Sequence, residues 1–208
     1  MKVVLYGASG MVGSRILREL ISRGHEVTAV VRSASDLNEP KAKTVQGDVF
    51  DANSVMNTAR GADAAISAYG PGPAKAEILL QATRSILSGL EQAGVRRLLM
   101  VGGAGSLEVA PGARLVDAPN FPAEWKPIAL AHCDALDALK ACKLDWTSLS
   151  PAAMLEPGER TGKFRLGKDS FMTDAQGQSK ISVEDLAVAM VDELEKPAHI
   201  RQRFAVAY

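Results

Sequence analysis

The sequence predicts a mixed α/β protein in which helices cover both faces of a parallel β-sheet. Short β-branched runs alternate with longer amphipathic stretches along the whole chain, and the short runs are apolar at consecutive positions, as in strands buried on both faces. The chain has 208 residues, 47% of them hydrophobic, which is enough for one sizeable core but few for two domains. We therefore predict one domain over residues 1–208.

The first half of the chain alternates strands with helices. Val3-Val4-Leu5-Tyr6 is the first predicted strand, and a helix over 11–22 follows it, because apolar residues recur there at helical spacing. The other elements predicted in this half are strands over 26–31, 44–46 and 63–68 and a helix over 52–59 that Asp51 can cap.

The second half begins at Gly70-Pro71-Gly72-Pro73, which breaks the chain before a long predicted helix over 74–92. A strand over 95–101 leads into an irregular stretch over 102–123, and loops of this length in compact domains are usually functional or mobile. The remaining predicted elements are a helix over 124–142, a strand over 144–149, a helix that Ser182 opens and a last strand over 204–206. A segment over about 151–181, rich in Gly, Lys and Asp, is expected to carry one or two short strands.

The charge balance argues against several classes of partner. Lys and Arg number 24, as do Asp and Glu, so the net charge is zero and no basic run stands out. This disfavours nucleic acid and a polybasic contact with a membrane, because phosphate binding needs a concentrated positive field. No window approaches the roughly 20 consecutive apolar residues of a membrane helix. We expect a small-molecule ligand and a monomer or homodimer.

The two cysteines, Cys133 and Cys142, fall in one predicted helix. Their spacing corresponds to about 13 Å along that helix, beyond the reach of a disulfide. Free thiols favour a cytoplasmic location, and neither cysteine has a partner at metal-ligand spacing, so no metal site is predicted.

The loop Gly7-Ala8-Ser9-Gly10-Met11-Val12-Gly13 follows the first predicted strand and opens the first predicted helix. In that context G-x-x-G-x-x-G predicts a dinucleotide-binding site in a Rossmann-type, doubly wound sheet. The first glycine turns the chain, the second lets the backbone approach the pyrophosphate, and the third allows close packing of helix on sheet. The residues predicted to hold the pyrophosphate at the helix amino end are Gly7, Ser9, Gly10, Met11, Val12 and Gly13.

Arg32 stands at the end of the second predicted strand. An NAD site usually has an acidic residue here for the ribose 2′-hydroxyl, whereas an arginine suits a 2′-phosphate. Arg32 therefore favours NADPH over NADH, with a solvated arginine as the alternative. Asp48 and Val49, after the third predicted strand, fall where such folds contact adenine, although Asp48 could simply cap a turn.

With these residues in place, the chain resembles the atypical short-chain dehydrogenase/reductase group. It is most similar to the NADH-flavin reductases, which are related to biliverdin-IXβ/flavin reductase and to NmrA-like proteins. The resemblance covers essentially the whole chain. Besides the glycine loop it rests on Gly47-Asp48-Val49, Val101-Gly102-Gly103-Ala104-Gly105-Ser106, Leu149-Ser150-Pro151-Ala152 and Pro157-Gly158-Glu159-Arg160-Thr161-Gly162.

The resemblance implies a seven-stranded sheet with the nicotinamide over the carboxyl ends of strands four to six. It also implies a substrate pocket between the loop after the fifth strand and the segment 152–165. The residues it places along the nicotinamide end are Ala68, Tyr69, Gly70, Gly102, Gly103, Pro151 and Ala152.

The chain departs from the wider group at the catalytic positions. Ordinary members reduce carbonyls with a serine and a Tyr-x-x-x-Lys pair, in which the lysine lowers the tyrosine pKa. Here Ile128 and His132 take the tyrosine and lysine positions, and Gly103 takes that of the serine. Hydride transfer to a flavin needs less help than reduction of a ketone, because the ring delocalises the added charge and solvent can supply the proton.

Three side chains remain as catalytic candidates. Ser106 would hydrogen-bond a substrate carbonyl or merely form a turn. His132 would act as an acid or pack on an apolar helical stripe. Tyr69 would donate a proton or stack on a ligand. Arg160 and Lys163 would bind a substrate anion or be solvated loop charges.

We therefore expect an NAD(P)H-dependent oxidoreductase that reduces flavins or similar flat acceptors, with flavin as a substrate and not a prosthetic group. The first alternative is a non-catalytic NADP(H)-binding redox sensor of the NmrA-like kind. The second is an epimerase or dehydratase, which needs a general acid or base that the Tyr-Lys positions do not supply.

Overall fold

The computed structural model describes residues 1–208, with all side chains except those of Ala34 and Pro73. Its strands in the central sheet are β1 (Lys2–Tyr6), β2 (Glu26–Val31), β3 (Lys43–Gln46), β4 (Ala64–Ser67), β5 (Arg97–Val101), β8 (Asp145–Pro151), β10 (Arg165–Gly167) and β12 (Gln202–Ala207). They lie in the order β10-β12-β8-β5-β4-β1-β2-β3. All neighbours are parallel except β10, which runs antiparallel to β12.

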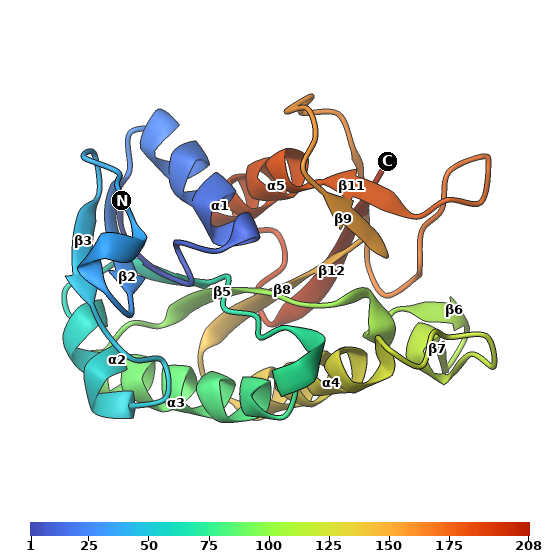
Figure 1. Ribbon diagram of the computed structural model, residues 1–208, viewed down its shortest axis with the longest axis horizontal. Helices are drawn as coiled ribbons and strands as arrows, with labels where there is room; N and C mark the ends of the chain where they lie inside the picture. The colour runs from blue at the N-terminus through green and yellow to red at the C-terminus, as the bar shows by residue number, and fades with distance from the viewer.

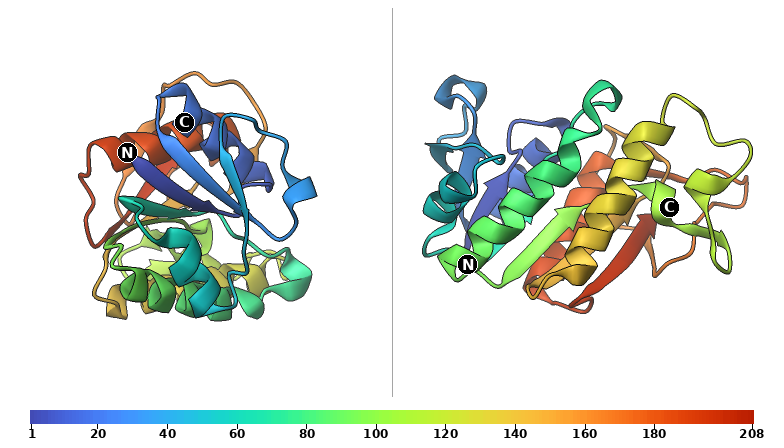
Figure 2. Two further views of the ribbon diagram at one scale, coloured as in Figure 1. Left: turned by 90° about the vertical axis from the view of Figure 1, so that its left-hand side faces the viewer. Right: turned by 90° about the horizontal axis from the view of Figure 1, so that it is seen from below.

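Five helices cover this sheet: α1 (Met11–Ser22), α2 (Ala52–Ala59), α3 (Ile78–Ala93), α4 (Lys126–Ala141) and α5 (Val183–Glu195). Helices α1 and α5 pack together on one face, and α2, α3 and α4 cover the other (Figures 1 and 2). Within β1 the side chains alternate between two cores: Val3 and Leu5 pack with α1 and α5, whereas Val4 and Tyr6 pack on the opposite face. The structure thus confirms the doubly wound α/β prediction.

The sheet has one more strand than the resemblance implied. The additional strand, β10, belongs to the segment 151–181, which folds back along β12 at the sheet edge. That segment also contributes β9 (Met154–Glu156) and β11 (Lys180–Ser182), which pair with each other, so it carries three short strands where one or two were expected. The Arg165 side chain stabilises the edge by donating to the Tyr208 and Thr173 carbonyls.

Two predicted boundaries shift because of local turns. The helix expected from Ala74 begins at Ile78, because Pro73–Lys75 forms a separate 3₁₀ turn, η2. The strand expected from Val95 begins at Arg97, because the Val95 amide still donates to the Leu90 carbonyl as α3 ends at Gly94.

The stretch after β5 is less irregular than expected. It contains the 3₁₀ turns η3 (Ala104–Ser106) and η4 (Leu115–Asp117) and a small hairpin of β6 (Glu108–Ala110) and β7 (Ala113–Arg114). The predicted caps are present: Asp51 accepts from the Asn53 amide at 2.9 Å, and Ser182 accepts from the Asp185 amide at 3.0 Å.

Candidate cofactor and active site

The glycine loop is a close backbone crossing that leaves no room for side chains. Gly7 has φ of +78°, and a Cβ there would lie 2.8 Å from backbone atoms of Ala68 and Tyr69. A Cβ on Gly13 would lie 2.0 Å from the Gly7 carbonyl oxygen. The loop therefore requires glycine at both positions, as the dinucleotide-binding pattern predicts.

The amino end of α1 is open to an anion. Gly10 is the N-cap residue and supplies no side-chain hydrogen bond to the first turn. The backbone N–H groups and the positive end of the helix dipole there suit a pyrophosphate. The loop and the helix end thus fit the phosphates of a dinucleotide.

A cavity of about 170 Å³ extends from this loop. Nine predicted cofactor residues line it: Gly7, Ser9, Gly10, Arg32, Asp48, Val49, Ala68, Tyr69 and Gly70. These residues come from four loops that follow β1, β2, β3 and β4, so the parallel sheet gathers them at the carboxyl edge of its strands.

Phe50 also lines this cavity and was not predicted from the sequence. The Phe50 ring packs edge-on against Tyr69, with centroids 5.7 Å apart, and its amide donates to the Asp48 carboxylate at 2.8 Å. Asp48 therefore does cap a turn, as the alternative interpretation held. An aromatic residue two positions after Asp48 was the available signal, because flat rings suit an adenine site.

Arg32 lies exposed at the mouth of the cavity and also lines an adjoining hollow of about 620 Å³ with Asp48 and Ser54. A guanidinium here is accessible to a 2′-phosphate, the role that the sequence analysis gives it.

Tyr69 lies at the same end of the cavity. Partial burial raises the pKa of Tyr69, while the nearby Arg32 lowers this pKa and Asp48 raises it further. Its position between Phe50 and these charges favours contact with the cofactor over donation of a proton to the substrate.

Four of the residues expected around the nicotinamide lie at the ends of β5 and β8, which are neighbours in the sheet: Gly102, Gly103, Pro151 and Ala152. The other three, Ala68, Tyr69 and Gly70, follow β4 and line the cavity described above. A Cβ on Gly102 would lie 2.8 Å from the Ser148 hydroxyl, and a Cβ on Gly103 would lie 3.0 Å from ring and Cβ atoms of His132. Pro151 and Ala152 are buried beside them. The imidazole therefore occupies space next to Gly103 that a serine side chain would need.

His132 is a poor acid in this setting. Burial lowers the pKa of His132 to about 4, so the ring is neutral near pH 7. Its Nδ1 is buried without a hydrogen-bond partner among the described residues.

Ser106 is buried in η3, and its hydroxyl accepts a hydrogen bond from Arg203 Nη1 at 2.8 Å. Arg203 also donates to the Ser106 carbonyl at 2.8 Å. This engagement favours the turn-forming role of Ser106, and its catalytic role stays a prediction.

The motif Pro157–Gly162 anchors the segment 151–181 to the helices. Arg160 donates to both carboxylate oxygens of Glu19 on α1, at 2.7 and 2.8 Å. Thr161 and the Gly162 amide bond the buried carboxylate of Asp185 on α5. Arg160 is therefore ion-paired with Glu19 while about half of its side chain stays in solvent. Its role as a ligand for a substrate anion stays a prediction.

Comparison with known proteins decides the family. The sequence model of the NAD(P)H-binding family matches residues 7–197. The chain belongs to this family. Membership confirms the predicted nicotinamide dinucleotide and the small-molecule ligand class.

Three solved structures are similar to this member of the NAD(P)H-binding family over its whole length. A Burkholderia pseudomallei protein described as a putative exported protein is 46% identical, with a TM-score of 0.93 and 100% of both chains covered. A putative epimerase from Bacteroides thetaiotaomicron is 45% identical, with a TM-score of 0.92, covering 100% of this chain and 96% of that one. A putative NADH-flavin reductase from Streptococcus pneumoniae TIGR4 is 39% identical, with a TM-score of 0.89, covering 100% and 99%.

These neighbours confirm the Rossmann fold and the resemblance to NADH-flavin reductases. Among the described residues, no group of three or more His, Cys, Asp or Glu side chains is placed to hold a metal ion. None of the helices in the described chain combines the length and apolar character needed to cross a membrane.

Proposed function

We propose that the protein is an NADPH-dependent reductase of flavins or similar flat acceptors. The observation that carries this proposal is the contact between Gly103 and His132 at the nicotinamide end of the site. A glycine and a neutral imidazole stand there, so the site has neither the serine nor the lysine that prepares a carbonyl for reduction. The similarity to a Streptococcus pneumoniae protein described as a putative NADH-flavin reductase supports the same choice.

In this proposal the residues of the cavity bind and orient the cofactor. The glycine loop and the amino end of α1 hold the pyrophosphate, and Arg32 binds the 2′-phosphate of NADPH, with NADH as a weaker ligand. Phe50 and Tyr69 flank the adenosine. Gly102, Gly103, Pro151 and Ala152 bound the nicotinamide end, where the missing side chain of Gly103 lets His132 form part of the wall.

The bound cofactor supplies a hydride. The protein positions the two reactants. It holds the hydride donor at the carboxyl edge of the sheet, where a second flat ring can lie at reacting distance. Such positioning provides most of the acceleration. A flavin that dissociates after reduction takes its proton from solvent. The neutral His132 neither gives nor takes a proton near pH 7, which is consistent with an acceptor that needs no acid.

Steady-state turnover tests the proposal. Purified protein is mixed with NADPH and riboflavin or FMN, and the loss of the nicotinamide absorbance band is followed. We expect NADPH oxidation that saturates with flavin and that fails with Gly13→Ala. Tight NADPH binding without turnover on any flavin would reject the reductase and favour the redox sensor.

A further inference from the structure

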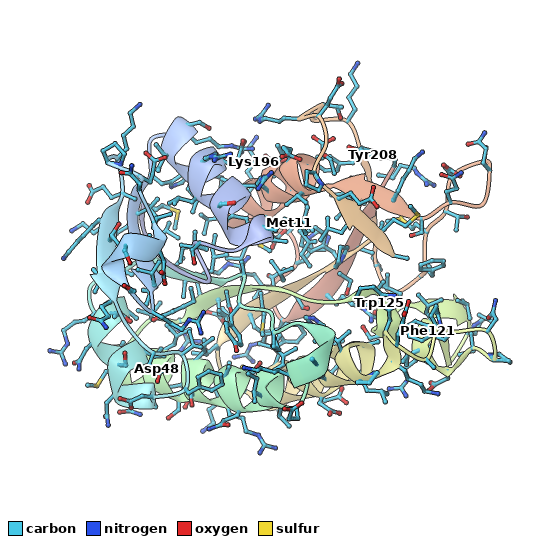
Figure 3. All side chains as sticks on the ribbon, viewed as in Figure 1. Met11, Asp48, Phe121, Trp125, Lys196 and Tyr208 are labelled. Carbon is cyan, nitrogen blue, oxygen red and sulfur yellow. The ribbon has the colours of Figure 1, made fainter. Side chains whose placement is uncertain are left out.

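Three large apolar side chains are left exposed at the carboxyl edge of the sheet. Met11, Trp125 and Met154 keep 46%, 51% and 48% of their surface accessible. Met11 begins α1 after β1, Met154 follows the end of β8, and Trp125 precedes α4, which runs back from this edge. Figure 3 shows Met11 and Trp125 on the same side of the molecule, on the helix layers above and below the sheet. Contiguous exposed apolar surface marks binding sites, and these three side chains share one edge of the sheet.

Helix formation does not explain Trp125. It occupies the N-cap position of α4 and makes no capping hydrogen bond with its side chain, where Ser, Thr, Asp or Asn would stabilise the helix. The other tryptophan, Trp146, is only 4% exposed. About half of the Trp125 surface therefore lies in solvent, and the side chain does not stabilise the start of the helix by capping it.

The backbone of Trp125 is nevertheless held beside the loop that follows β5. The Ala129 amide donates to the Trp125 carbonyl at 3.0 Å. Ala129 packs so closely on η3 that a Cβ on Gly105 would lie 2.8 Å from the Ala129 methyl group. The first turn of α4 is thus pressed against the loop after β5, next to Gly102 and Gly103.

We propose that Trp125 is the stacking surface for the planar acceptor, which is a heteroaromatic ring of the flavin type. This inference rests on the proposed function. Helices cover both faces of the sheet, so an acceptor reaches the nicotinamide end only from the carboxyl edge (Figure 1). An exposed indole is the largest flat apolar surface that the described chain offers there, and Met154 on β9 adds a polarisable contact.

The test measures flavin binding and not only turnover. Riboflavin, which lacks a phosphate, is bound to NADP⁺-saturated protein, and its Kd is measured by equilibrium dialysis alongside tryptophan emission. In the wild type we expect riboflavin to quench the emission, because Trp125 is the accessible one of the two tryptophans. Trp125→Phe keeps an aromatic ring and should retain binding while most of the quenching disappears. Trp125→Ala should weaken riboflavin about tenfold or more, as loss of one aromatic stacking partner does.

Leu130→Ala on the same helix is the matched control, since Leu130 is also exposed, and it should leave riboflavin binding unchanged. Affinity for NADP⁺ should be the same in all four proteins. If wild type and Trp125→Ala bound riboflavin equally well and both turned over, the stacking role of Trp125 would be overturned but the proposed function would stand. Absence of riboflavin binding and turnover in the wild type, with NADP⁺ still bound, would overturn the proposed function as well.

Discussion

Arg203 on β12 donates two hydrogen bonds to Ser106, one to its carbonyl and one to its hydroxyl, each 2.8 Å long. The same guanidinium pairs with Asp169 in the segment 151–181. One largely buried arginine therefore joins the loop after β5 to that segment, the two walls between which the substrate pocket is expected.

Replacing this arginine should loosen both walls. We expect Arg203→Ala to lower the free energy of unfolding by about 2 kcal/mol, because it leaves the buried Ser106 groups without their charged donor. Urea unfolding measures this loss. The KM for flavin should rise while the Kd for NADPH stays within about twofold, since the cofactor cavity does not include Arg203. Unchanged stability would show that the contact contributes nothing.

Replacing Ser106 with alanine distinguishes a structural role of its hydroxyl from a catalytic one. If the hydroxyl serves only Arg203, Ser106→Ala should cost about 1 kcal/mol of stability and leave kcat for flavin nearly unchanged. A large fall in kcat without loss of stability would instead support the catalytic prediction for Ser106.

Two costs of a side chain at Gly7 can be measured separately: the collision at the close backbone crossing and the strain of the positive φ. Gly24 has nearly the same φ, +79° against +78°, but a Cβ there would meet no atom within 4 Å. Gly24→Ala should therefore cost only the strain of the left-handed conformation, about 1 kcal/mol. Gly7→Ala adds the collision with the Ala68 and Tyr69 backbone and should lose more stability and most NADPH binding. If the two substitutions had equal effects, the backbone crossing at Gly7 would not be what excludes a side chain.

Arg32 should determine the preference between the two cofactors. Arg32→Glu replaces a cation with an anion beside the expected 2′-phosphate, so NADPH should bind roughly 100-fold more weakly and NADH only slightly so. Titrations of nicotinamide fluorescence give both constants. Arg60→Glu is the matched control, because Arg60 is also exposed but follows α2 at the opposite edge of the sheet. Equal weakening of NADPH and NADH would refute the 2′-phosphate role.

The desolvated imidazole of the half-buried His132 should make stability depend on pH. Its pKa falls from 6.5 to about 4 on folding. Between these values the unfolded chain binds a proton that the folded protein does not, so stability falls as the pH drops below about 6.5. The shift corresponds to a loss of up to about 3 kcal/mol near pH 4.

His132→Gln removes the titrating group and keeps a polar side chain of similar reach. The difference in unfolding free energy between pH 7 and pH 5 should shrink in this variant relative to wild type. The wild-type pH profile of kcat/KM should also lack a histidine-like inflection between pH 6 and 8. The same pH slope of stability in both proteins would refute the assigned pKa of His132.

Local patterns predicted the parts of this protein that local chemistry determines. The apolar run of β1, the glycine loop and the position of Arg32 after β2 are read directly from neighbouring residues. Most of the residues predicted from them line one cavity, and their contacts with a cofactor stay a prediction. The caps at Asp51 and Ser182 belong to the same class, because each acts within three residues of itself.

The features that were missed depend on contacts between distant positions. Arg160 and Glu19 are 141 residues apart, and Arg203 and Ser106 are 97 apart. The antiparallel pairing of β10 with β12 likewise follows from the path of the segment 151–181, which has little hydrophobic periodicity to reveal it. The contact of His132 with Gly103 joins a helix to a strand end, so the sequence showed an unusual pair of residues but not that they touch.

In the proposed reaction this site passes a hydride to a flat ring without a placed acid. The most direct measurement is an anaerobic assay with NADPH and riboflavin, run beside a panel of aldehydes and ketones, in which nicotinamide and flavin absorbance are recorded together. We expect one flavin to be reduced for each NADPH oxidised, at a rate independent of pH between 6 and 8. The carbonyl compounds should give no turnover. Efficient reduction of a carbonyl compound, or NADPH oxidation that leaves the flavin oxidised, would contradict the proposed reaction.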